Sequence, residues 1–165
     1  MKVSVETSLG AFTLELYPEK SPKTVANFVE YVNAGFYDGL IFHRVIDGFM
    51  IQGGGMTEDM QQKPTRAAIE NEAAQGIDNE LGTIAMARTM DPHSATSQFF
   101  INVNNNRFLN AKESQDGWGY AAFGRVIDGM DTINAIKGVA TGQRGGHQDV
   151  PVEAVTINTM ELVAE

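Results

Sequence analysis

Apolar and polar residues alternate in two short runs near the start of the chain, over Val3–Glu6 and Phe12–Leu16. Successive side chains of a strand point to opposite faces, so a period of two is typical of a strand that buries one face. Ser8, Leu9 and Gly10 lie between the two runs and carry a turn signal. The pattern predicts a β-hairpin with one buried face.

The next segment has a helical period instead. Ser21 and Pro22 form a helix start, with serine as the capping residue and proline at the first helical position. Apolar side chains then recur at three- and four-residue spacing, at Val25, Phe28, Val29 and Val32. The pattern predicts an amphipathic helix over residues 22–34. A second, shorter helix is predicted over residues 131–136.

Short apolar runs separated by turn signals fill much of the remaining chain. They predict further strands over residues 40–46, 49–52, 83–87, 98–103, 120–126 and 154–163. Residues 57–81 are polar and irregular, which is long for a loop in a compact domain and indicates a functional surface. Glu70 and Glu72 within this stretch fit a solvated segment. Residues 139–149 are polar and rich in glycine, so we expect a loop there.

The predicted elements amount to about eight strands and two helices, and the strands follow one another in hairpin-like order. That order favours a mostly β fold, an antiparallel sheet closed into an eight-stranded β-barrel that two α-helices cap. We expect one domain over residues 1–165, and nothing in the pattern demands more than a monomer.

The amino-acid composition excludes several kinds of partner and chemistry. The net charge is −9 and the 12 basic residues are scattered, so we expect no binding to nucleic acid or to an anionic membrane. The absence of cysteine excludes disulfides, thiol catalysis and cysteine-ligated zinc. The start, MKVSVETSLG, lacks the apolar core of a signal peptide, and no run reaches the roughly 18 apolar residues of a spanning helix. We therefore expect a cytoplasmic protein, although the trimmed mature form of an exported protein would show the same pattern.

Two segments combine large apolar side chains with a few strong hydrogen-bonding groups: FHRVIDGFMIQGG and MARTMDPHSATSQFFINV. Strand alternation places Arg44 on the opposite face from His43, and places Gln98 on the same face as Phe100. Taken singly, the aromatic residues fit core packing and Arg44 fits a solvated rim. Arg44 together with Gln52 and Gln98, among aromatic and sulfur side chains, indicates a functional site.

Other candidate chemistry is weaker. Asp91, His93 and Ser94 include the residue types of a hydrolase triad, but near neighbours on one loop rarely reach the required geometry. Gly53–Gly55 lacks the Lys-Ser/Thr of a phosphate-binding loop and fits a bulge or a close approach of chains. The histidines lack the spacing of metal ligands, so no metal site is predicted.

These segments resemble the sequence blocks of the cyclophilin-type peptidyl-prolyl cis–trans isomerases. FHRVIDGFMIQGG is similar to the family's FHR-x-x-x-GFM-x-QGG block, SQFFI to a second block and FGRVIDGMD to a third. Within the family the tighter match is to the bacterial peptidyl-prolyl isomerase B group, through GWGYAAFG and HQDVP. The resemblance covers essentially the whole chain. It implies an eight-stranded antiparallel barrel capped by two helices, and rotation about the bond before proline without a cofactor.

The resemblance also implies residue roles. Arg44 is similar to the catalytic arginine of the family, and Gln52 to a polar neighbour in the site. On chemical grounds we expect Gln52 to hold the Arg44 guanidinium and to count as catalytic with it. The implied substrate-binding residues are Phe49, Met50, Ala87, Arg88, Thr89, Gln98, Phe100, Phe108, Leu109 and Tyr120. The implied partners are proline-containing peptides and unfolded or folding proteins. An alternative is a binding module or chaperone of the same fold, which would hold proline segments without turning them.

Three positions depart from the best-known eukaryotic pattern of the family. That pattern has Trp where Phe108 stands, His where Tyr120 stands and Asn where Arg88 stands. The Trp helps to bind cyclosporin in that group, so we expect weaker inhibition of this protein by cyclosporin.

Overall fold

The computed structural model describes residues 1–164. No helix among them is long and apolar enough to cross a membrane. The prediction of a mostly β protein with two α-helices is confirmed. The elements are β1 (Lys2–Thr7), β2 (Gly10–Leu16), α1 (Pro22–Asn33), β3 (Phe42–Ile46), β4 (Met50–Gly53), β5 (Thr83–Met86), β6 (Phe99–Asn102), the 3₁₀-helix η1 (Arg107–Leu109), β7 (Ala122–Asp128), α2 (Met130–Lys137), β8 (Thr141–Arg144), β9 (His147–Pro151) and β10 (Ile157–Val163).

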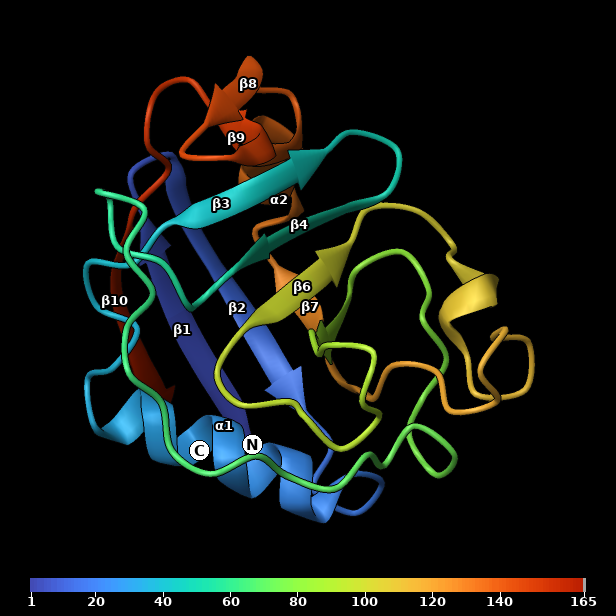
Figure 1. Ribbon diagram of the computed structural model, residues 1–165. Coiled ribbons are helices and arrows are strands. Elements are labelled where there is room, and N and C mark those ends of the chain that lie inside the picture. The colour runs from blue at the N-terminus through green and yellow to red at the C-terminus, as the bar shows by residue number, and fades with distance from the viewer. Residues whose placement is uncertain (165) are drawn as a thin grey trace.

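Eight of these strands form one antiparallel sheet in the order β10-β1-β2-β7-β5-β6-β4-β3. The sheet curls strongly, so that its first and last strands approach each other (Figure 1). These two edges are linked by hydrogen bonds at or beside the strand ends. The Gly39 amide donates to the Ile157 carbonyl at 2.7 Å, and the Phe42 amide donates to the Val155 carbonyl at 3.0 Å.

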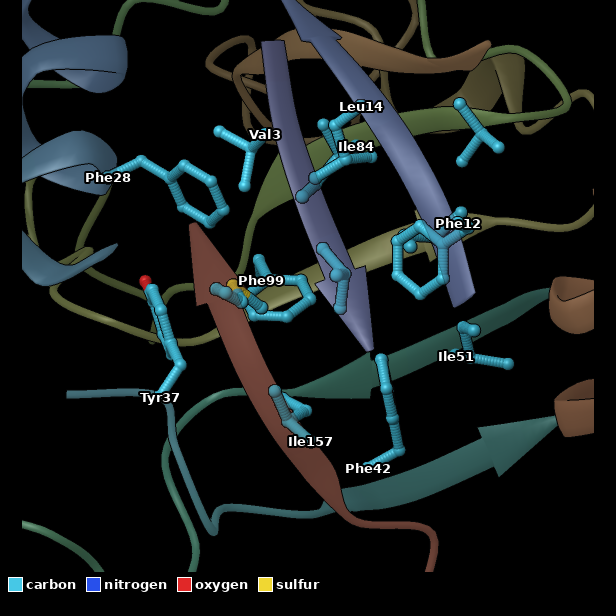
Figure 2. Close-up of a cluster of buried hydrophobic side chains, with 14 of the residues drawn as sticks. Val3, Phe12, Leu14, Phe28, Tyr37, Phe42, Ile51, Ile84, Phe99 and Ile157 are labelled. Carbon is cyan, nitrogen blue, oxygen red and sulfur yellow. The ribbon is translucent and has the colours of Figure 1, made fainter. Parts of the chain in front are cut away.

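The curl of the sheet encloses the main apolar cluster, which Figure 2 shows in part. Phe99 lies near its centre, edge-on to Phe28 of α1 at 5.8 Å and to Tyr37 at 5.4 Å between ring centroids. Tyr37 keeps its hydroxyl satisfied by donating to the Ser97 carbonyl at 2.8 Å. Burial of each such side chain contributes about 1.5–3 kcal/mol to stability.

Helices α1 and α2 lie at opposite ends of the curled sheet (Figure 1). Helix α1 begins at Pro22 as predicted, but the prediction of Ser21 as the capping side chain is wrong, because the buried Ser21 hydroxyl makes no hydrogen bond. Glu72 caps the helix instead. Its carboxylate accepts from the Thr24 amide and hydroxyl, both at 2.7 Å, and from the Lys23 amide at 3.3 Å.

A carboxylate at this place satisfies amides that have no partner within the helix and opposes the helix dipole. Glu72 is only 5% exposed, so the prediction that it belongs to a solvated segment is wrong.

The loop predicted over residues 139–149 is also wrong, because the structure has the hairpin of β8 and β9 there. Gly145 and Gly146, with φ of 57° and 82°, form its turn. Such left-handed residues are what a tight hairpin turn requires. All four residues of β8 are exposed, so the segment shows no apolar alternation by which the sequence pattern could have revealed a strand.

Candidate active site

A second apolar cluster lies on the face of the sheet opposite the main core. Phe100 belongs to it whereas its neighbours Phe99 and Ile101 belong to the core, and Met50 belongs to it whereas Ile51 does not. A cavity of about 130 Å³ opens in this cluster. Its lining residues are Arg44, Phe49, Met50, Gln52, Ala87, Arg88, Phe100, Leu109 and Tyr120.

Arg44 stands at the mouth of this pocket because a tight hairpin sets it opposite Gln52. Gly48, with φ of 83°, allows the turn between β3 and β4, and Arg44 then pairs with Gln52 across the ladder. Arg44 Nη1 donates to Gln52 Oε1 at 3.5 Å, and Gln52 Nε2 donates to Gln98 Oε1 at 2.9 Å. A Cβ at Gly55 would collide with the Gln98 side chain, so the close approach predicted for these glycines is confirmed there.

Aromatic pairs form the walls of the pocket. Phe108 stacks on Phe49 with ring centroids 5.7 Å apart and planes 28° apart. Tyr120 meets Phe100 edge-on at 5.7 Å. Rings have few rotatable bonds, so pockets that they line keep their shape.

The structure brings the predicted site residues together at one place. Every residue that lines the pocket is among those singled out from the sequence. The other three border it: Gln98 through Gln52 and Phe108 through Phe49, as described, while Thr89 lies in an adjoining groove beyond Arg88.

Arg88 contributes its side chain to the wall of the pocket. The side chain is 4% exposed. Its Nε and Nη2 donate to the Gly119 carbonyl at 3.1 and 3.0 Å, and Nη2 donates to Asp116 Oδ2 at 2.7 Å. The guanidinium also lies 4.4 Å from the Tyr120 ring centroid, in a cation–π contact. Arg88 therefore ties Tyr120 and the loop before it to the strand edge.

Asp116 organises that loop. Its Oδ1 accepts from the Ser114 hydroxyl at 2.7 Å and from the Trp118 and Gly119 amides at 2.9 and 3.2 Å. Hydrogen bonds from Ser114, from the Trp118 amide and from Arg88 hold the pKa of Asp116 well below its usual range.

A network of buried asparagines behind the pocket was missed from the sequence. Asn102 donates to Asn79 Oδ1 at 3.1 Å and accepts from Asn106 at 2.8 Å. Asn106 also donates to the Phe49 carbonyl at 2.8 Å, and Asn79 to the Tyr120 carbonyl at 3.1 Å. Two walls of the pocket are thus fixed through their backbones. The run of asparagines at positions 104–106 was the signal available in the sequence.

Asp91, His93 and Ser94 do not form a hydrolase triad in the structure. Ser94 Oγ donates to the Asp91 carbonyl at 2.6 Å, and His93 Nδ1 accepts from the Asn71 amide at 3.1 Å. The histidine therefore contacts a backbone amide rather than the serine, and no nucleophile–base pair forms. Within residues 1–164 no group of three or more His, Cys, Asp or Glu is placed to hold a metal ion.

His43 is buried on the face of β3 away from Arg44, as the alternation predicted. It is 6% exposed, its Nδ1 has no hydrogen-bond partner, and its ring centroid lies 6.4 Å from that of His147. Burial, followed by the charges of His147 and Arg44, lowers the pKa of His43 to about 4. His43 is therefore neutral at physiological pH.

Comparison with known proteins points to one family. Residues 2–162 match the family described as cyclophilin type peptidyl-prolyl cis-trans isomerase/CLD. The chain is 59% identical over 162 residues to peptidyl-prolyl cis-trans isomerase cyp18 of Streptomyces antibioticus, with 98% of each chain covered. It is 55% identical over 161 residues to peptidyl-prolyl cis-trans isomerase B of Escherichia coli (strain K12), covering 97% of this chain and 98% of the relative.

A solved structure has the same fold. The chain is similar, with a TM-score of 0.82 and 25% identity, to a cyclophilin type peptidyl-prolyl cis-trans isomerase of Cryptosporidium parvum. The similarity covers 100% of both chains, and that protein was crystallised in the presence of the dipeptide Ala-Pro.

Proposed function

Because the chain belongs to the cyclophilin-type peptidyl-prolyl cis–trans isomerases, we propose that it turns the peptide bond before proline in the pocket beside Arg44. The family and the named relatives make it an enzyme of this class. The observation that supports this location is the exposed guanidinium of Arg44 beside a small pocket that aromatic and apolar side chains help to line. The binding-module alternative is not favoured, since the relatives are named as isomerases.

The chemistry requires only that the twisted amide be favoured over its planar forms. Resonance between nitrogen and carbonyl opposes rotation by about 18–20 kcal/mol, and uncatalysed exchange takes roughly 10–100 s. At the twist the nitrogen regains a localised lone pair. In our proposal Arg44 donates a hydrogen bond to that lone pair, using the rigid and permanently charged fork of its guanidinium.

Gln52 positions Arg44 in this scheme. Its Oε1 accepts a hydrogen bond from Arg44 and its Nε2 donates one to Gln98. The bond to Gln98 fixes the orientation of the Gln52 amide, and so keeps Oε1 directed at the guanidinium. The apolar part of the pocket would grip the proline ring between Phe100, Met50 and Leu109, which are all at most 8% exposed. A held ring and a held cation allow the chain before the proline to turn against the chain after it.

The hydrogen bond from Arg44 accounts for only part of the required fall in the rotation barrier. A rate increase of about 10⁴-fold requires the barrier to fall by roughly 5.5 kcal/mol. A charged hydrogen bond contributes about 1.5–3 kcal/mol. The remainder has to come from the pocket, through binding of the twisted form and exclusion of water.

We expect Arg44→Ala to lower kcat/KM by at least about tenfold while the fold persists, because Arg44 is exposed and carries little packing. The measurement is a proline-switch peptide assay, with circular dichroism to confirm folding. Arg125→Ala, which removes another partly exposed arginine, is the matched control and should keep full activity. A folded Arg44→Ala variant with normal kcat/KM would refute the assignment of Arg44.

The partners in this proposal are proline-containing peptides and unfolded or folding proteins. The related structure crystallised in the presence of Ala-Pro supports the first of these. A chaperone role would coexist with isomerisation, and an aggregation assay with Arg44→Ala separates the two. A cytoplasmic location and a monomeric state stay predictions, which cell fractionation and sedimentation test directly.

We also propose that the sheet behaves as a closed barrel and that residues 1–165 form one domain. The hydrogen bonds of Gly39 to Ile157, the first residue of β10, and of Phe42 to Val155, just before it, support closure. The single family match over residues 2–162 supports one domain. Slow amide exchange at Gly39 and Phe42, matching that of the central strands, would test closure.

A further inference from the structure

A second cavity adjoins the proline pocket. It is lined by residues 88–90, 108–109, 113–116 and 120, and its volume is about 550 Å³. Arg88, Leu109 and Tyr120 line both cavities. The two cavities therefore adjoin each other and share part of their walls.

The groove is bordered by apolar side chains that solvent reaches. Met90 is 95% exposed and Phe108 is 57% exposed, and both line the groove. Large apolar residues that are exposed together beside a cavity mark a binding surface more often than an accident of the fold.

The charged groups of the groove already have partners. Arg88 forms an ion pair with Asp116 Oδ2 at 2.7 Å. The other carboxylate oxygen of Asp116 accepts hydrogen bonds from the Ser114 hydroxyl and from two loop amides. Glu113 lies 3.5 Å from Arg107. Because these charges are satisfied within the chain, what the groove offers to a ligand is its apolar surface.

We propose that this groove is a second subsite for the same polypeptide, and that it binds one large apolar side chain, leucine, methionine or an aromatic residue, near the proline. The inference rests on the proposed function, since it takes the first pocket as the proline site. An extended chain advances about 3.3 Å per residue and points alternate side chains the same way, so the residue bound is about two or three positions from the proline.

The subsite would give the enzyme a preference for segments that folded proteins hide. Large apolar side chains are mostly buried in native proteins and exposed in unfolded ones. A proline next to such a residue is then recognised mainly while its chain is unfolded. Arg88 and Tyr120, as the shared wall, set the spacing between the two side chains that are bound.

The test uses peptides with a fixed Ala-Pro unit and one variable residue, Ala, Leu, Phe, Lys or Glu, scanned over three positions on each side. For the wild-type protein we expect Leu or Phe at one position to lower KM about fivefold relative to Ala, with kcat unchanged. Calorimetry should show the same fivefold change in affinity. Equal KM for all residues, or a preference for Lys, would overturn the proposal.

Variants then locate the effect. Met90→Ala removes one border of the groove and Gln115→Trp fills it, and each should reduce the preference for Leu to less than about twofold while activity on the Ala peptide is kept. Val152→Ala, which truncates a 68% exposed apolar residue outside the groove, should leave the preference intact. A preference that survives both groove variants would contradict the assignment.

Failure of the proposed function looks different. If no peptide is isomerised, the proline site is wrong, but calorimetry with the Leu and Ala peptides on the wild-type and Met90→Ala proteins still decides the groove.

Discussion

The two apolar clusters of this protein share strands β4, β5, β6 and β7, yet only the second opens on the pocket beside Arg44. Phe99 and Phe100 are consecutive on β6 and are 0% and 4% exposed. Phe99 is surrounded by Phe28, Tyr37 and Phe42, all edge-on or close to it. Phe100 has protein on one side and the small pocket on the other. Both clusters are buried. They differ in that aromatic rings surround Phe99, whereas Phe100 faces the pocket.

The sharpest way to test this comparison is to truncate each of the two phenylalanines. Phe99→Ala should lower the free energy of unfolding by about 3–5 kcal/mol, because it leaves a cavity enclosed by aromatic rings. Phe100→Ala only enlarges a cavity that is already open, so its loss of stability should be smaller by about 1–2 kcal/mol. Urea unfolding of both variants measures the difference.

Activity should show the reverse order. Folded Phe100→Ala should lose about tenfold or more in kcat/KM, whereas folded Phe99→Ala should keep most of it at a temperature where it is stable. If the two variants lost equal stability and equal activity, then packing and catalysis would not be separated between the two faces of β6.

Strand β3 repeats the comparison with charged groups, since Arg44 lies at the pocket and His43 is buried behind it. Burial lowers the pKa of His43 to about 4 from an ordinary value of 6.5. As pH falls from 6.5 to 4, only the unfolded state takes up this proton, so stability falls over that window. The His43 contribution to the loss is about 3 kcal/mol at most.

Replacing the buried imidazole isolates that contribution. His43→Gln should flatten the pH dependence of the free energy of unfolding between pH 6.5 and 4, and the exposed His93→Gln should not. The measurement is urea unfolding at several pH values. An unchanged slope in His43→Gln would show that His43 is not held neutral by the fold.

The smallest effect is expected at the rim of the pocket, where Phe108 is 57% exposed against Phe49. Phe108→Trp restores the residue of the eukaryotic pattern and should tighten cyclosporin binding several-fold, with little change in kcat/KM. Titration calorimetry of both proteins with cyclosporin measures this, and unchanged affinity would count against the correspondence at Phe108.

The local sequence pattern was sufficient to predict which face of a strand a residue occupies, because that depends only on its neighbours along the strand. The period of two placed Arg44 away from His43 and Phe100 away from Phe99, and the turn at Gly48 then sets Arg44 opposite Gln52. Pattern failed where partners come from far along the chain. Glu72 caps a helix that starts 50 positions earlier, and Asn79 bonds to Tyr120 some 41 positions later. Nothing near Ser21 in the sequence shows that a distant carboxylate takes its place.

The pairing of β1 with β10 has a consequence for how the protein reaches this structure. Lys2 lies opposite Val163 in that ladder, so the sheet joins residues from the two extremes of the chain. A ladder of this kind forms only after nearly the whole chain has been ordered into one loop, and contacts so distant in sequence slow folding to the range of about milliseconds to seconds. During synthesis β1 has to wait for its last partner, with one edge unpaired. A slow step in the folding of this chain is therefore expected from the topology of its sheet.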